Sequence, residues 1–150
     1  MPRTPTEPLP LVAEPGHLIR RAHQRAVALF AEHHGRHITP VQYAVLRAVH
    51  DEPGLDQVTL AERVALDTST TADIATRLEA KGWLHRELLP RRQRSLRLSD
   101  AGQAVLADML PRVNAMYADL LGPLNATERA EFLRLLQRVA GLDTTPGATP

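Results

Sequence analysis

The chain contains no cysteine, which excludes disulfide bonds, thiolate metal sites and thiol-based redox sensing. It also lacks a run of about 20 apolar residues, so we expect no membrane-spanning segment. The first fifteen residues are rich in proline and carry charges, unlike the apolar core of a signal peptide. These absences together predict a cytoplasmic protein.

The common motifs of catalysis are missing as well. The sequence has no glycine-rich phosphate loop, no Gly-x-Ser-x-Gly motif and no cysteine nucleophile. We therefore expect no enzymatic activity and no cofactor. His33 and His37 are four residues apart, but Gly35 and a new helix start at Thr39 interrupt the helix face they would share. The sequence therefore predicts no metal site.

An excess of charge of one sign is absent too, because the formal net charge is only +1. Affinity for nucleic acid must then come from local clustering. One segment provides it, with five arginines against a single acid, Glu87: Arg86, Arg91, Arg92, Arg94 and Arg97. Short apolar runs flank a turn at residues 90–93, which predicts a β-hairpin. A basic hairpin tip fits a DNA minor groove.

A chain of 150 residues with 43% hydrophobic content is expected to form one compact domain. We place this domain at residues 16–142, between disordered tails at 1–15 and 143–150. Apolar residues at helical spacing predict six helices. They cover about 16–34, 40–52, 59–66, 68–81, 100–120 and 126–139.

Capping signals mark several of these helix starts. Three pairs have the spacing of capping boxes: Thr39 with Gln42, Thr59 with Glu62, and Asn125 with Glu128. Ser99 can cap the long helix that follows the hairpin. Asp67 or Thr68 can cap the helix that precedes the hairpin.

Two short helices followed directly by a basic hairpin have the order of a winged helix-turn-helix. The predicted fold class is therefore mainly α, with a small β-hairpin wing. The first and the last two helices carry apolar stripes that the small central motif cannot cover, so we expect a homodimer. The candidate interface residues are Leu110, Val113, Tyr117, Leu135 and Leu136.

Residues 74–84 and 91–102 resemble the MarR family of bacterial transcriptional regulators, and the resemblance extends over about 16–142. Relatives usually carry Asp-Arg-Arg at the wing tip, where this chain has Pro90-Arg91-Arg92. Pro90 removes a carboxylate that can orient a wing arginine in relatives. The resemblance implies a homodimer with intertwined terminal helices. It also implies a recognition helix in the major groove and a near-palindromic operator as the DNA partner.

The same resemblance assigns DNA contacts to the helix after residue 67 and to the wing. Those residues are Thr68, Ser69, Thr70, Thr71, Asp73, Ile74 and Arg77 in the helix, and Arg91, Arg92 and Arg94 in the wing. Hydroxyls near a helix N-terminus can bind phosphates or base edges, and arginine can bind guanine. Asp73 repels phosphate, so we expect it to accept from a cytosine amino group or to pair with Arg77.

Residues 16–26 are similar to the opening helix of the NicR-like subgroup of this family, whose members govern breakdown of nicotinate and related aromatic acids. The residue types agree, since arginine suits a carboxylate and histidine a ring hydroxyl or nitrogen. Phe30 or Tyr43 would form the apolar wall of such a site. The candidate ligand residues are His17, Arg20, His23, Tyr43 and His50.

The expected function is that of a ligand-responsive repressor, which a small aromatic acid releases from its operator. One alternative leaves the polar residues of the first helix as surface or dimer-interface groups without a ligand. A second is a winged-helix protein-interaction module that binds no DNA. Such a module has no need of five arginines in its wing, and a steep salt dependence of DNA affinity would distinguish the two.

Overall fold

A computed structural model describes residues 7–92 and 94–142 of the chain. The tails expected at 1–6 and 143–150 lie outside the described residues. Residues 7–14, expected to belong to the first tail, include a short 3-10 helix at 11–13, and the first α-helix begins one residue early, at Pro15. Proline is favoured at the first position of a helix, where its fixed φ suits the helix and its missing N–H is not needed.

The structure is mainly helical with one two-stranded antiparallel sheet, as the sequence predicts. The elements are η1 (Leu11–Ala13), α1 (Pro15–His34), α2 (Pro40–Asp51), α3 (Gln57–Val64), α4 (Thr68–Ala80), β1 (Leu84–Leu88), η2 (Pro90–Arg92), β2 (Arg94–Leu98), α5 (Asp100–Leu120) and α6 (Ala126–Val139).

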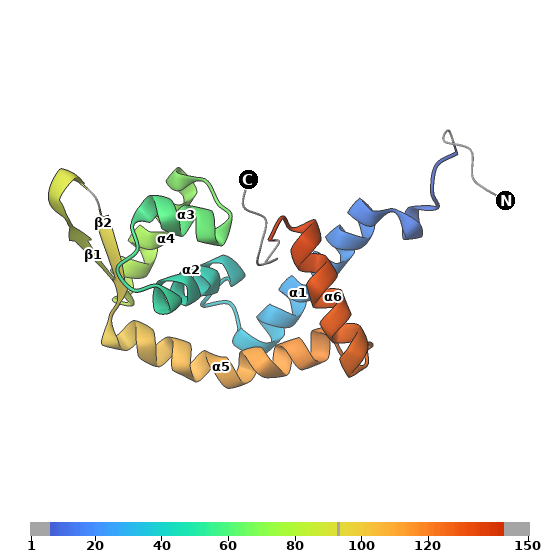
Figure 1. Ribbon diagram of the computed structural model, residues 1–150. Helices are drawn as coiled ribbons and strands as arrows, with labels where there is room; N and C mark the ends of the chain where they lie inside the picture. Colours follow the sequence, from blue (N-terminus) through green and yellow to red (C-terminus); the bar gives the residue numbers. More distant parts are fainter. Residues whose placement is uncertain (1–6, 93, 143–150) are drawn as a thin grey trace.

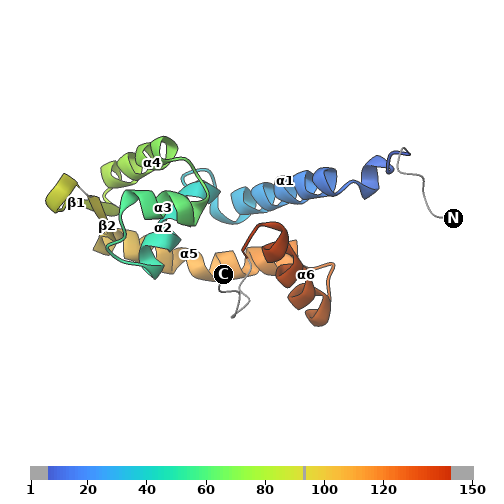
Figure 2. The same cartoon turned by 45° about the horizontal axis from the view of Figure 1, so that its top comes forward.

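The long helix α5 connects the two ends of the molecule (Figure 1). Helices α2, α3 and α4 gather near its N-terminal end beside the β1–β2 hairpin, which we call the wing. Helices α1 and α6 lie toward its other end. In a second view, the wing and the start of α1 point away from the body in opposite directions (Figure 2).

Most of the expected helix starts are confirmed. Thr39 and Asn125 each form a complete capping box, in which the cap side chain and the residue three positions later exchange hydrogen bonds. Ser99 caps α5, where its hydroxyl accepts from the N–H of Gly102 at 3.0 Å.

The start expected at Thr59 is wrong, because the preceding acid caps α3 instead. The Asp56 carboxylate accepts from the Thr59 N–H at 2.7 Å, so the helix begins at Gln57. It ends at Val64, since Ala65 adopts the left-handed conformation with φ 56°. Asp67 then caps α4 by accepting from the N–H of the third residue after it.

The middle of β2 anchors the wing to the loop between α2 and α3. Leu84 pairs with Leu98 and Leu88 with Arg94 across the two strands. The N–H of Gly54 donates to the Leu96 carbonyl at 2.8 Å, and the Leu96 N–H donates to the Leu55 carbonyl at 3.0 Å. These bonds fix the strands to the helical motif.

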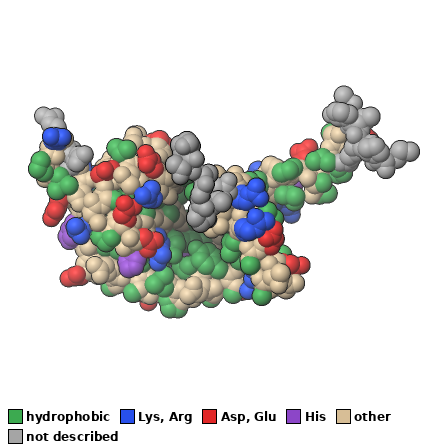
Figure 3. Space-filling view, viewed as in Figure 1, with side chains coloured by type: hydrophobic (Ala, Val, Ile, Leu, Met, Phe, Trp, Pro, Cys, Tyr) green, Lys and Arg blue, Asp and Glu red, His purple; other side chains and the backbone are tan. Residues whose placement is uncertain are grey.

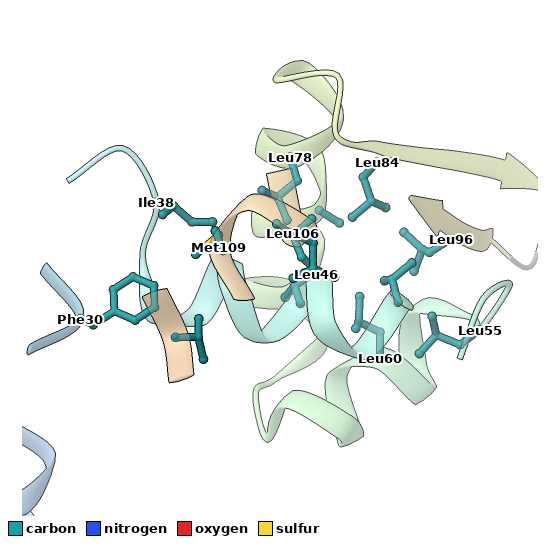
Figure 4. Packing of buried hydrophobic residues seen from close by; sticks show 14 of the residues in the cluster. Phe30, Ile38, Leu46, Leu55, Leu60, Leu78, Leu84, Leu96, Leu106 and Met109 are labelled. Atoms are coloured by element: carbon teal, nitrogen blue, oxygen red, sulfur yellow. The ribbon is translucent and has the colours of Figure 1, made fainter. Parts of the chain in front are cut away.

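The hydrophobic core joins the helix-turn-helix, the wing and α5 (Figure 4). Its fully buried leucines come from several elements: Leu46, Leu60, Leu78, Leu84, Leu96 and Leu106. Burying each leucine side chain contributes roughly 1.5 to 3 kcal/mol, so the core fixes the base of the wing against the helices.

Two of the helices, α1 and α6, carry exposed apolar stripes. Helix α6 has no buried residue, and it exposes Phe132, Leu133, Leu135, Leu136 and Val139. Leu18, Ile19 and Val27 are exposed on α1. These stripes are the surface that the expected homodimer would cover. Among the described residues, no helix is long and apolar enough to cross a membrane.

Not every expected interface residue faces outward. Tyr117 on α5 is exposed, as Leu135 and Leu136 are, but Val113 is buried in the core of its own chain. Leu110 is half-buried. Val113 therefore packs within the protomer, because it lies on the face of α5 that meets the rest of the core.

Candidate DNA interface and ligand cavity

The first turn of α4 exposes three hydroxyl side chains, those of Thr68, Ser69 and Thr70. Asp67, the cap of this helix, accepts from both the N–H and the hydroxyl of Thr70 at 2.7 Å. These bonds from Thr70 lower the pKa of Asp67. The turn therefore presents hydroxyls and N–H groups suited to phosphate. Beside them lies one ionised carboxylate, that of Asp67, which already accepts two hydrogen bonds from Thr70.

Thr71 does not belong to this exposed face, contrary to the sequence prediction. Its side chain is fully buried, and its hydroxyl donates to the Asp67 carbonyl at 2.8 Å. The buried stripe of α4 consists of Thr71, Ala75 and Leu78. These residues are four and three positions apart, and this helical spacing in the sequence could have revealed that Thr71 faces inward. Ile74 is half-buried and packs against the core.

Asp73 and Arg77 are both exposed on α4, but no ion pair joins them among the described residues. Both side chains are therefore available to DNA. For Asp73, acceptance from a base amino group is the remaining interpretation.

The wing tip carries an exposed arginine in an unusual backbone conformation. Arg91 has φ 66°, in the left-handed region that favours glycine and asparagine. Arg94 and Arg97 are exposed on β2. Arg92 belongs to η2, and its side chain lies outside the described part of the chain.

Arg86 faces the protein instead of the solvent. Its side chain is only 13% exposed and pairs with Glu79 of α4 at 3.3 Å. It also donates to the hydroxyl of Thr76 at 3.0 Å. Arg86 thus links the wing to the recognition helix, a role that the linear cluster of arginines does not reveal.

A cavity of about 910 Å³ lies between the helix-turn-helix and the long helices. It is lined by His23, Ala26, Val27 and Phe30 of α1, by Pro40, Tyr43, Ala44, Arg47, Ala48 and Asp51 of α2, by Glu52 and Arg63, and by Leu110, Val113, Asn114, Met116 and Tyr117 of α5. Pockets of 300 to about 1,000 Å³ with apolar walls and few polar groups are typical of small-molecule sites. In the space-filling view, hydrophobic side chains also gather in the hollow above α5 (Figure 3).

The cavity combines an aromatic wall with charged groups. Phe30 and Tyr43 lie with ring centroids 6.1 Å apart. Burial, and then the neighbouring Tyr117, raises the pKa of Tyr43, so this phenol stays neutral and can donate a hydrogen bond.

Each of the two lining arginines is paired with an acid. Arg47 contacts Asp51 at 3.1 Å, and Arg63 contacts Glu52 at 3.1 Å. The site therefore carries two balanced ion pairs at an apolar pocket.

The five candidate ligand residues divide into two groups. His23 and Tyr43 line the cavity, together with Phe30. His17, Arg20 and His50 are outside its lining within one chain. Arg20 and His17 contact each other at 3.1 Å on exposed α1, and His50 is exposed at the end of α2.

Sequence reasoning missed the charged lining residues. Arg47 lies four residues after Tyr43 on α2, so the helical period could have placed both on one face. No local signal places Arg63 at the cavity, because its position depends on how α3 packs against α2. Among the described residues, no group of three or more histidines and acids could hold a metal ion.

Comparison with protein families gives a match to the MarR family over residues 38–96. The chain is 33% identical to the transcriptional regulator HosA of Escherichia coli O127:H6 over 125 residues, which are 82% of this chain and 92% of HosA. It is 31% identical to the HTH-type transcriptional repressor NicR of Pseudomonas putida, over 93% of this chain and 90% of NicR.

Solved structures show the same fold. The PcaV transcriptional regulator of Streptomyces coelicolor, in complex with its natural ligand, superposes with a TM-score of 0.85 at 40% identity, covering 91% of this chain and 98% of PcaV. BpsR of Bordetella bronchiseptica, whose DNA binding is regulated by 6-hydroxynicotinic acid, gives 0.81 at 29% identity, with 90% and 99% covered. A mutant of MarR from E. coli complexed with operator DNA gives 0.78 at 26% identity, with 85% and 94% covered.

Proposed function

The chain belongs to the MarR family of transcriptional regulators, and on that premise we propose that it is a homodimeric repressor that a small aromatic acid releases from a near-palindromic operator. The repressor acts in the cytoplasm and has no catalytic activity. Thr68, Ser69, Thr70, Asp73 and Arg77 of α4 contact DNA in the major groove. Arg91, Arg92 and Arg94 of the wing contact the backbone or the minor groove.

The observation that carries the ligand proposal is the cavity beside the DNA-binding motif. Its volume of about 910 Å³ accommodates an aromatic ring, and Phe30 and Val113 provide apolar contacts. Tyr43 and His23 supply polar groups for a ring hydroxyl or nitrogen. Two similar proteins support a small-molecule ligand here. PcaV has been solved in complex with its natural ligand, and the DNA binding of BpsR is regulated by 6-hydroxynicotinic acid.

We propose Arg20, with His17, as the partner of the ligand carboxylate. Arg20 contacts a histidine ring, whereas Arg47 and Arg63 each already pair with a carboxylate. Arg20 also precedes His23 by about one helical turn on α1. Within the described ranges Arg20 has no acidic partner, so it gains more from a ligand carboxylate, because no existing ion pair has to be broken.

Calorimetric titration with 6-hydroxynicotinate and salicylate tests this assignment in two matched variants. Arg20→Ala should spare operator binding and raise the dissociation constant of the acid more than tenfold, or by about 1.4 kcal/mol. Arg21→Ala is the control, because Arg21 points about 100° away on the same helix. If Arg20→Ala binds the acid as the wild type does and Arg21→Ala fails, the proposed helix face is wrong. If no acid binds the wild type, the ligand-sensing half of the proposal is wrong.

A further inference from the structure

Arg63 differs from the other residues that line the cavity in the helix to which it belongs. The other lining residues come from α1, α2, α5 and the C-terminal cap of α2, whereas Arg63 belongs to α3. Within the described residues, it is the one lining group that α3 and α4 contribute. Any direct effect of an occupant on these two helices therefore passes through this side chain.

The contact that Arg63 makes joins two rigid elements. Its Nε donates to Oε2 of Glu52, the C-terminal cap of α2, at 3.1 Å. Both side chains are about half exposed, at 55% and 49%. Over the described part of the chain, Nε is the only atom of this guanidinium with a partner, so its two Nη groups remain available to an oxygen of a ligand.

The connection between α3 and α4, the helix proposed to contact DNA, is very short. Arg63 lies in the last turn of α3, and Asp67, the cap of α4, follows four residues later. The connection includes the left-handed residue Ala65. Leu60 and Leu78 are both fully buried in the shared core, so the two helices are packed together. A shift of Arg63 relative to α2 would therefore change the orientation of α4.

We propose that the Glu52–Arg63 ion pair transmits occupancy of the cavity to the DNA-binding helices. This inference rests on the proposed function. In the empty protein the pair holds α3 against the end of α2. An oxygen of the acid that Arg20 does not hold attracts the guanidinium and competes with the Glu52 carboxylate for it, so it weakens the pair. The ligand thus favours the arrangement of α3 with the weakened pair over the arrangement in which α3 is held against α2. Such a difference in affinity for two arrangements is what a population shift requires.

The test measures operator affinity with and without saturating 6-hydroxynicotinate or salicylate, whichever binds the wild type more tightly. In the wild type the acid should weaken operator binding at least tenfold. In Arg63→Gln it should change operator binding less than threefold, although calorimetry still detects binding of the acid. Arg112→Gln is the matched control, since it removes an arginine ion pair, with Asp108 on α5, outside the cavity lining and leaves α3 untouched, and it should keep the full response.

A second variant works without any ligand. Glu52→Gln removes the acid of the pair, and we expect it to lower operator affinity at least threefold in the absence of acid. A full tenfold response in Arg63→Gln, or unchanged operator affinity in Glu52→Gln, would overturn the coupling role and leave the proposed function intact. A wild type that binds operator but responds to neither acid would instead overturn the proposed ligand sensing. The Glu52→Gln result would then decide whether the pair positions α3.

Discussion

The Arg86 guanidinium on β1 donates to both carboxylate oxygens of Glu79 on α4, at 3.3 Å through Nε and at 3.3 Å through Nη2. The hydrogen bond from Arg86 is the main reason why the pKa of Glu79 is lowered. The pair lies between the wing and the recognition helix, the two elements proposed to contact DNA. It therefore holds the wing against α4.

Replacing Arg86 should affect both stability and DNA binding. We expect Arg86→Gln to lower the free energy of unfolding by about 1 kcal/mol, because the lost bonds are charge-assisted but Glu79 is partly exposed. Operator affinity should fall at least threefold. Arg97→Gln, exposed on β2, should leave the unfolding free energy unchanged. Denaturant titration measures the unfolding free energy of each variant. Equal stability of the two variants would contradict the role of Arg86.

The exposed wing arginines should contribute through the DNA backbone. Arg91→Ala combined with Arg94→Ala should weaken operator binding at least tenfold, or about 1.4 kcal/mol. Each arginine that no longer neutralises a phosphate should reduce the slope of log affinity against log salt by about 0.9. The control is Arg134→Ala on α6, which removes an ion pair with Glu131 far along the chain. A folded double variant with the wild-type salt slope would refute the wing assignment.

Gly102 is required where α5 meets the residue that precedes the wing. A Cβ atom at this position would lie 2.0 Å from the Trp83 carbonyl oxygen, which is backbone and cannot rotate away. Gly102→Ala should therefore lower the free energy of unfolding by about 2 kcal/mol, despite the better helix propensity of alanine. Gly16→Ala on α1 is the matched control, since among the described residues no atom beyond its chain neighbours and the backbone of its own helix lies within 4 Å of the place that its new methyl group would take. Thermal unfolding that ranks the two variants in the opposite order would contradict this packing.

The helix starts can be predicted from the sequence because a cap and its partner are only three residues apart. Thr39 with Gln42 is such a local signal, and the structure confirms it. The start of α3 is harder to predict because two capping patterns overlap, one beginning at Asp56 and one at Thr59. The Asp56 carboxylate occupies the Thr59 N–H and thereby decides between them.

The functional residues are less predictable, because their surroundings come from distant parts of the chain. The arginine cluster indicates a DNA-binding wing, but the inward position of Arg86 depends on α4 lying beside β1. His23 and Tyr43 are expected near a ligand from the sequence, and they line the cavity. Arg63 cannot be assigned from its neighbours in sequence, since only the packing of α3 against α2 brings it there.

His34 should make the stability of the fold depend on pH. Its ring is buried against Phe30, with centroids 4.5 Å apart, and neither ring nitrogen has a partner among the described residues. Burial, followed by the charge of Arg112 and the neighbouring histidines, lowers the pKa of His34 from its ordinary 6.5. Below pH 6.5 the unfolded chain therefore binds a proton that the folded chain does not.

The free energy of unfolding should consequently fall as the pH decreases from 6.5 toward the lower folded-state pKa of His34. His34→Leu should reduce this slope and leave stability at about pH 8 equal or higher, because it removes buried nitrogens without partners. His50→Gln, at an exposed position, should keep the wild-type slope. Urea titrations from about pH 5 to 8 provide the comparison, and an unchanged slope in His34→Leu would show that His34 does not titrate as argued.

Control of operator binding by an aromatic acid is the central property of the proposed regulator. Its most direct test is the affinity of the wild-type dimer for an operator fragment, selected from fragmented genomic DNA, measured by fluorescence anisotropy as 6-hydroxynicotinate or salicylate is added. We expect tight binding without acid and at least a tenfold loss of affinity at saturation, within the usual range of about 5- to 150-fold for coupling between two sites. An operator affinity that stays constant over all concentrations of both acids would contradict the account.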